Sequence, residues 1–113
     1  MNRRATILLI EDNEGDVILT KEGFEESRII SKIDVVRDGM AGINYLENLI
    51  HSGESFPDII LLDINLPKKN GQEVLQFIKA HESLKHIPVI MLTTSSSEND
   101  VINSYRNYAN CFI

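Results

Sequence analysis

Hydrophobic residues along this chain alternate between short continuous runs and segments in which they recur every three or four positions. The runs at residues 5–10, 58–62 and 89–92 are almost entirely apolar, which is typical of strands buried on both faces of a parallel sheet. The run at 32–36 is less apolar, as expected of a strand near a sheet edge. Residues 111–113 begin a fifth strand. These runs predict five strands.

The segments between the runs predict four helices, at 14–28, 40–51, 72–81 and from about residue 95 onward. In each, the apolar residues share one face. The residues on these faces are Val17, Thr20, Phe24, Met40, Ile43, Leu46, Ile50, Val74, Leu75, Ile78, Val101, Ile102, Tyr105 and Tyr108. Tyr105 and Tyr108 could face a partner or the sheet, and their spacing favours the core for at least one of them. Alternating strands and helices predict an α/β fold, a parallel sheet with helices on both faces. At 113 residues the chain has room for one domain.

The charge of the chain limits the kinds of partner that it is expected to bind. Eleven Lys and Arg residues against 17 Asp and Glu residues give a net charge of −6. An acidic surface repels phosphate backbones and anionic lipid, which argues against nucleic-acid or membrane binding. The single cysteine, Cys111, cannot form an internal disulfide, which favours a cytoplasmic protein. No apolar run approaches the roughly 20 residues that span a bilayer.

Polar residues able to do chemistry follow three of the predicted strands. Glu11 and Asp12 follow the first, Asp63 follows the third and Thr93 follows the fourth. Ligands of such sheets bind beyond the carboxyl ends of the central strands. If the first and third strands are neighbours, three carboxylates converge, and each pair at about 4 Å would repel by roughly 4 kcal/mol. The cluster must therefore protonate, stay solvated or hold a cation, and Mg²⁺ suits carboxylate oxygens.

A magnesium ion among carboxylates would in turn attract a phosphoryl group. Asp63 is a candidate nucleophile, since carboxylates form acyl phosphates in several enzyme classes, and Thr93 offers a hydroxyl to a phosphoryl oxygen. Each residue taken alone has an ordinary structural explanation as a turn former or helix cap. Their conjunction at three strand ends favours the site.

Three stretches of the chain resemble the receiver domain of two-component response regulators. They are residues 7–13, residues 58–67 with Asn70-Gly71, and residues 88–93. Their order and spacing span the whole chain. Within the family, residues 11–17, 66–71 and 93–96 are most similar to small single-domain regulators partnered with phytochrome-type sensor histidine kinases.

The resemblance implies a flavodoxin-like, doubly wound five-stranded sheet of order 2-1-3-4-5. It also implies that Asp63 accepts a phosphoryl group from a kinase phosphohistidine. Glu11, Asp12 and Asp63 would hold Mg²⁺ together with the backbone carbonyl of Asn65.

Two further residues have roles that the resemblance implies. Thr93 would bind a phosphoryl oxygen after transfer. Phe112 falls at the family's switch aromatic, which turns inward as the threonine moves. Such a regulator signals by changing shape and turns over no external substrate.

The sequence departs from the family at its C-terminal end. Receivers carry a lysine at the end of the fifth strand, and this chain ends at Ile113, two residues before that lysine is due. We therefore expect residues 1–113 to form a receiver domain truncated at the fifth strand, without the last helix. The sheet face left exposed would invite a homodimer.

Three other functions compete with this interpretation. A small Mg²⁺ phosphohydrolase would also use an Asp nucleophile, but it commonly has a second acid where this chain has Asn65. A nucleotide or flavin binder would need a Gly-rich loop after the first strand, and Gly15 alone does not make one. An adaptor that works without phosphorylation is the third, and it requires the missing lysine to be a natural absence.

Overall fold

The chain folds around one parallel sheet, seen in a computed structural model that describes residues 5–25, 30–64, 66, 68–92 and 111–112. The strand order is β2-β1-β3-β4-β5, which confirms the predicted α/β fold and its order. The strands are β1 (Ala5–Ile10), β2 (Ile30–Val36), β3 (Ile59–Asp63), β4 (Val89–Leu92) and β5 (Cys111–Phe112), and the helices are α1 (Glu14–Glu25), α2 (Gly39–Ser52) and α3 (Gly71–Ala80).

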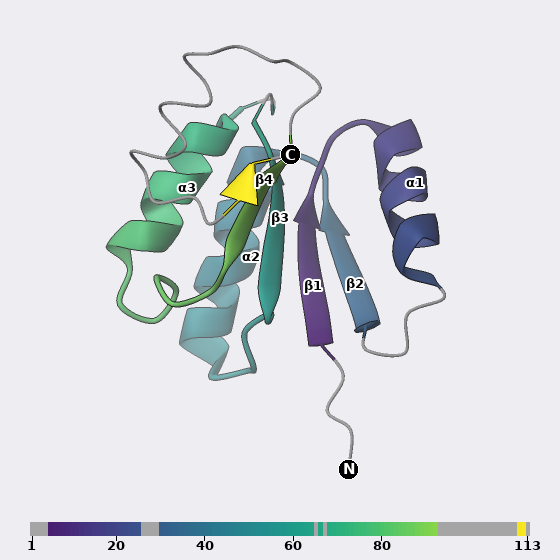
Figure 1. Cartoon of the computed structure of the whole chain (residues 1–113). Coiled ribbons are helices and arrows are strands. Elements are labelled where there is room, and N and C mark those ends of the chain that lie inside the picture. The colour runs from purple at the N-terminus through teal and green to yellow at the C-terminus, as the bar shows by residue number, and fades with distance from the viewer. Residues whose placement is uncertain (1–4, 26–29, 65, 67, 93–110, 113) are drawn as a thin grey trace.

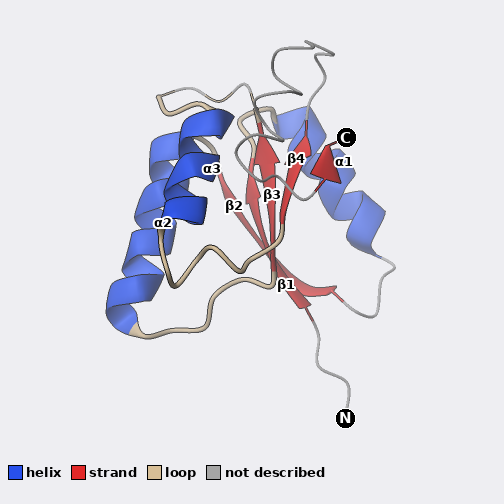
Figure 2. Cartoon of the chain, turned by 60° about the vertical axis from the view of Figure 1, so that its left-hand side comes forward, coloured by secondary structure: helices blue, strands red, loops and turns tan. Residues whose placement is uncertain are grey.

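The described helices cover the two faces of the sheet unequally. Helix α1 lies on one face, and α2 and α3 lie side by side on the other (Figures 1 and 2). The larger core cluster fills the space beneath α2 and α3, where Leu8, Ile60 and Leu75 are fully buried. The smaller cluster, with Ile7 and Leu9 at its centre, packs against α1. Continuously apolar strands are therefore needed, because β1 and β3 bury side chains on both sides.

Local capping determines where two of the helices begin and end. Asp38 caps α2 by accepting a hydrogen bond from the backbone N–H of Ala41 at 2.7 Å. Gly53 ends α2 in the left-handed conformation at φ 74°, which glycine adopts without steric cost. Asn70 and Glu73 form a reciprocal capping box at the start of α3. This box places the first residue of α3 at Gly71, one residue earlier than predicted.

Most predicted bounds agree with the structure within two residues. Strand β3 reaches Asp63 because that residue still pairs with Leu92 of β4. Met40 was predicted on the apolar face of its helix, but it is 39% exposed in the first turn of α2. Residues 26–28 of the first predicted helix, and the helix predicted from about residue 95, lie outside the described residues.

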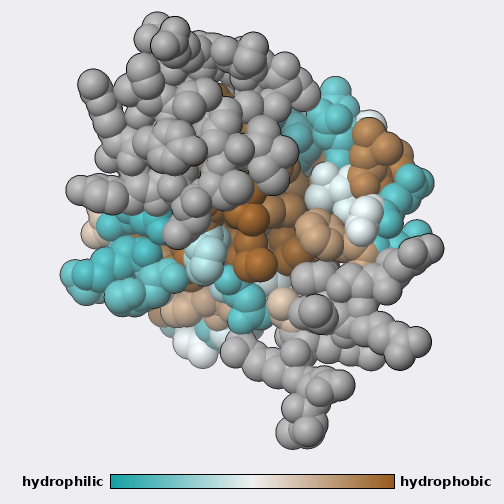
Figure 3. Space-filling model, in the orientation of Figure 1, coloured by the Kyte–Doolittle hydropathy of each residue, from teal (hydrophilic) through white to brown (hydrophobic). Residues whose placement is uncertain are grey.

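Apolar side chains reach the surface beside α1. Ile59, Ile90 and Leu92 are only partly buried and pack against the smaller core cluster. Figure 3 shows this apolar surface over the strands, on the face that carries α1. Among the described residues, none of the helices combines the length and apolarity needed to cross a bilayer.

Candidate functional site

The register of two neighbouring strands brings the predicted acids together. Ile10 of β1 pairs with Leu62 of β3, so the next residues, Glu11 and Asp63, leave the sheet at the same edge. One carboxylate oxygen from each of Glu11, Asp12 and Asp63 lies within 4.8 Å of the other two. Three carboxylates at this separation form a ligand set for a hard divalent cation.

Glu11 is the buried member of the cluster and is only 4% exposed. Its backbone N–H donates to the carbonyl of Val36 at 3.0 Å, which ties the end of β1 to the end of β2. Burial, a side-chain hydrogen bond with Asp63 and the negative charge of Asp63 together raise the pKa of the Glu11 carboxyl from 4.5 to about 7. A hydrogen bond from the backbone N–H of Asn13 acts in the opposite direction. In the metal-free chain Glu11 therefore binds a proton much more readily than an ordinary glutamate and exchanges it near neutral pH.

The other two acids are more accessible to solvent than Glu11. Asp12 is exposed and Asp63 is half-buried, so the cluster opens to solvent on one side. The segment that follows Asp12 is fixed by the start of α1, because the Asn13 side chain accepts from the backbone N–H of Asp16 at 2.9 Å. The arrangement can hold a partly hydrated cation and still admit an anionic group from solvent.

Backbone contacts position the segment after Asp63. The N–H of Ile64 donates to the carbonyl of Leu92 at 3.2 Å, and the N–H of Gly71 donates to the carbonyl of Ile64 at 2.8 Å. A Cβ at Gly71 would stand 2.4 Å from the carbonyl oxygen of Asp63. The first residue of α3 must therefore be glycine for the helix to pack directly against the backbone of Asp63.

A second close approach holds the same segment from the other side. A Cβ at Gly39, the first residue of α2, would stand 1.8 Å from the carbonyl oxygen of Lys69. Lys68 adopts a positive φ of 67°, and its ammonium lies 3.7 Å from the Asp38 carboxylate. The loop between β3 and α3 is thus packed on the start of α2.

The structure brings together three of the six site residues predicted from the sequence. Glu11, Asp12 and Asp63 meet as expected. Asn65 and Thr93 lie outside the described residues. Phe112 is described only as part of β5, where its backbone pairs with Met91.

Sequence analysis missed two contacts that support the site. The first is the close approach of Gly39 to the backbone of Lys69, for which glycine gives no sequence signal of its own. The ion pair between Arg37 and Glu14, which joins the end of β2 to the start of α1, had no sequence signal, because the two residues are far apart in the chain.

Comparison with known proteins identifies the family to which the sequence is similar. The family model described as the response regulator receiver domain matches residues 7–113. The response regulator Rcp1 of Synechocystis sp. is 43% identical over 113 residues, which cover 99% of this chain and 77% of that protein.

Solved structures of similar sequence share the fold. The Mn²⁺-bound form of response regulator Rcp1 has a TM-score of 0.89 and 44% identity, over 96% of this chain and 79% of that one. The phosphorylated cyanobacterial phytochrome response regulator RcpA has a TM-score of 0.91 and 44% identity, over 97% and 79%. The bacteriophytochrome response regulator AtBRR has a TM-score of 0.83 and 38% identity, over 98% and 81%.

Proposed function

Because this chain belongs to the response regulator receiver domain family, we propose that Asp63 is the side chain that accepts the phosphoryl group. The observation that carries the proposal is the gathering of Glu11, Asp12 and Asp63 within 4.8 Å at the carboxyl edge of the sheet. Asp63 is half-buried, so its carboxylate reaches solvent and is also near the carboxylates of Glu11 and Asp12. Its backbone is held by α3 and β4, so the carboxylate is presented in a fixed place.

We propose that the divalent cation of this site is Mg²⁺. Glu11, Asp12, Asp63 and the backbone carbonyl of Asn65 would supply its protein ligands. The set consists of hard oxygen atoms and leaves room for water, which suits Mg²⁺, and a relative of known structure binds Mn²⁺. When bound, the ion offsets the charge of the phosphoryl oxygens as they approach the acidic cluster.

The proposed transfer uses one oxygen of the Asp63 carboxylate. That oxygen forms a bond to phosphorus while the bond from phosphorus to a histidine nitrogen of the kinase breaks, and the electron pair of that bond stays on the imidazole. The product is an acyl phosphate on Asp63. Water later attacks the phosphorus, which releases inorganic phosphate and restores the carboxylate.

The response to phosphorylation would involve Thr93 and Phe112. The Thr93 hydroxyl would donate to a phosphoryl oxygen, and the Phe112 ring would move inward into the space that the threonine vacates. Thr93 comes directly after β4, which adjoins β3, and Phe112 belongs to β5, which adjoins β4, so a change at Asp63 has a short path to both.

We propose a phytochrome-type sensor histidine kinase as the donor, because regulators named for phytochromes are among the most similar structures. The chain would assist only its own phosphorylation and dephosphorylation and would turn over no external substrate. With a net charge of −6, its output would run through protein contacts and not through nucleic acid.

Labelling by a small acyl phosphate in the presence of Mg²⁺ tests the assignment of Asp63. Intact mass should show one phosphoryl group on the wild-type chain and none on Asp63→Asn. The matched control is Asp58→Asn just before the start of β3, where the amide oxygen can still accept the 2.8 Å hydrogen bond from the Thr6 N–H. The control should label like the wild type. Labelling of Asp63→Asn at the wild-type level would show that another group is the acceptor.

A further inference from the structure

Strand β2 forms one edge of the sheet, and in the described part of the chain its only strand partner is β1. The carbonyl of Val36 accepts from the N–H of Glu11, so the backbone groups of Val36 face β1. Because these directions alternate along a strand, the N–H and C=O groups of Ile33 and Val35 point away from the sheet. No hydrogen bond from another described residue reaches these two residues. The edge can therefore pair with a further strand.

The side chains of β2 also alternate between the two faces. Asp34 faces α2, where its carboxylate accepts from the Tyr45 hydroxyl at 2.6 Å. Lys32 lies on the same face, with its ammonium 3.5 Å from Asp34. Ile33 and Val35 pack on the other face in the core cluster that contains Val17 of α1. One face of the edge strand is thus charged and the other is apolar.

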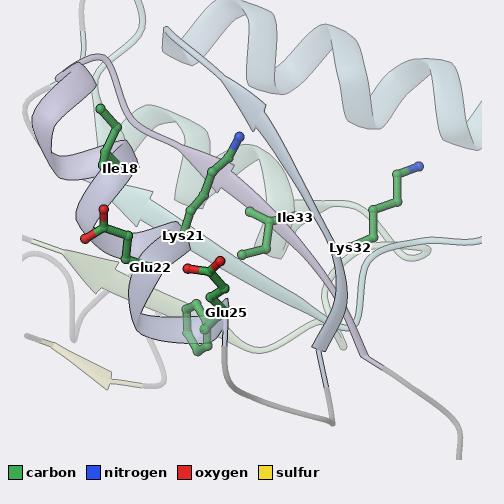
Figure 4. A pocket seen from close by; sticks show the side chains of 7 residues that line it. Ile18, Lys21, Glu22, Glu25, Lys32 and Ile33 are labelled. Carbon is green, nitrogen blue, oxygen red and sulfur yellow. The ribbon is translucent and has the colours of Figure 1, made fainter.

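Hollows flank β2 on both faces, so neither helix crowds the edge. On the α1 side, a groove of about 440 Å³ lies between the helix and the strand (Figure 4). It is lined by the apolar side chains Ile18, Phe24 and Ile33, by charged residues of α1 and by Lys32 at the strand edge. On the α2 side, a second hollow of about 440 Å³ is lined by Asp34, Tyr45 and a mixture of polar and apolar residues. A strand arriving at this edge would have space for its side chains on both sides.

We propose that this edge pairs with the β2 strand of a second copy of the chain. The two strands would run antiparallel, with the two-fold axis at Ile33. Lys32 would then lie opposite Asp34 of the partner subunit, and Asp34 would lie opposite Lys32 of the partner subunit. Ile33 would exchange two backbone hydrogen bonds with Ile33 of the partner subunit, and the charged pairs would occupy the closely spaced positions on either side, where Cα atoms are about 4.5 Å apart.

The charges of β2 select this register over its neighbours. An axis at Lys32 would place the two lysines opposite each other, and an axis at Asp34 would place the two aspartates opposite each other. Only the axis at Ile33 makes both cross-strand pairs attractive. The contact is self-complementary, as a two-fold interface requires. It would join two sheets edge to edge and differs from the exposed sheet face on which the sequence-based expectation of a homodimer rested.

Sedimentation of the full chain from micromolar to millimolar concentration tests the proposal without reference to the phosphoacceptor function. The wild type should show a concentration-dependent monomer–dimer equilibrium. Lys32→Asp should weaken dimerisation at least about tenfold, because each of the two attractive pairs becomes a repulsive one. The matched control Lys85→Asp changes the net charge equally at an exposed residue of the turn after α3, and its dimerisation should stay within about twofold of the wild type.

Mixing two variants separates a contact between copies from a contact within one copy. Asp34→Lys alone should also be monomeric. An equimolar mixture with Lys32→Asp should form a heterodimer, because each aspartate of one variant then faces a lysine of the other. Circular dichroism of each variant checks that it is folded. A wild type that stays monomeric up to millimolar concentration would overturn the proposal, as would Lys32→Asp dimerising like the wild type or a mixture that forms no heterodimer.

Discussion

Replacing Glu11 by Gln should stabilise the metal-free chain while weakening its response to metal. Glu11 is buried beside Asp63, and burial followed by the contact with Asp63 raises its pKa from 4.5 to about 7. The folded chain therefore resists the ionisation of Glu11 that the unfolded chain undergoes freely. Gln keeps the shape and can donate an N–H to Asp63 in place of the carboxyl proton, but it carries no charge.

The magnitude follows from the two pKa values and grows with pH. A carboxyl whose pKa is raised on folding does not lower the free energy of unfolding well below pH 4.5, where the folded and unfolded chains both hold the proton. The cost rises as the unfolded state ionises and reaches its full value once the pH passes about 7. At about 1.4 kcal/mol for each tenfold change, the free energy of unfolding of Glu11→Gln should exceed that of the wild type by roughly 1 kcal/mol near pH 5.5 and by at most about 3 kcal/mol near pH 8.

Urea unfolding at these two pH values, with and without Mg²⁺, measures the effect. Saturating Mg²⁺ should stabilise the wild type through binding to the folded state and should stabilise Glu11→Gln less, since one ligand charge is gone. The excess free energy of unfolding of Glu11→Gln over the wild type should therefore shrink or change sign when Mg²⁺ is added. Glu47→Gln, at an exposed position of α2, is the matched control. Its free energy of unfolding should differ from that of the wild type by the same small amount at both pH values, with or without Mg²⁺.

Two results would refute this reasoning. The first is a Glu11→Gln chain no more stable than the wild type near pH 8 without metal, which would mean that the Glu11 charge is not penalised in the fold. The second is equal stabilisation of both chains by Mg²⁺, which would mean that the ion binds elsewhere.

Three further predictions concern the support of the site, the switch and the core. Gly71→Ala should lower the free energy of unfolding by about 1–3 kcal/mol and slow phosphoryl labelling, because its Cβ would stand 2.4 Å from the carbonyl oxygen of Asp63; urea unfolding and a labelling time course measure both. Thr93→Ala should label at Asp63 but lose most of the change in amide shifts that labelling causes in the wild type, and an unchanged response would argue against the hydroxyl's role. Leu8→Ala should cost about 2–5 kcal/mol in urea, since Leu8 is fully buried in the larger core cluster.

The fold was predictable from the sequence because its strands and helices have different hydrophobic periods. The runs at 5–10 and 89–92 coincide with β1 and β4, since strands buried on both faces must be continuously apolar. Met40 was misassigned because a helical period gives the face of a residue but not whether the sheet extends far enough to cover it.

The acids of the site were predictable, and their electrostatic differences were not. Three carboxylates at strand ends can be found by counting positions along the chain. That Glu11 is buried while Asp12 is exposed depends on how the end of β1 is held against Val36, which no local pattern encodes. The close contact between Gly71 and the backbone of Asp63 was not predictable either. It depends on how tightly the start of α3 packs against the end of β3, which the sequence pattern does not give.

The pairing of β1 with β3 also determines where the chain tolerates a change of length. A one-residue insertion in either strand would rotate every later side chain of that strand to the opposite face and would separate Glu11 from Asp63. The turn after α2 has no such constraint, because Gly53 has open space around it and the next two residues are exposed. A fluorescent reporter grafted into this turn should leave the acidic cluster intact, which makes residues 53–55 the natural attachment point for a sensor built on this chain.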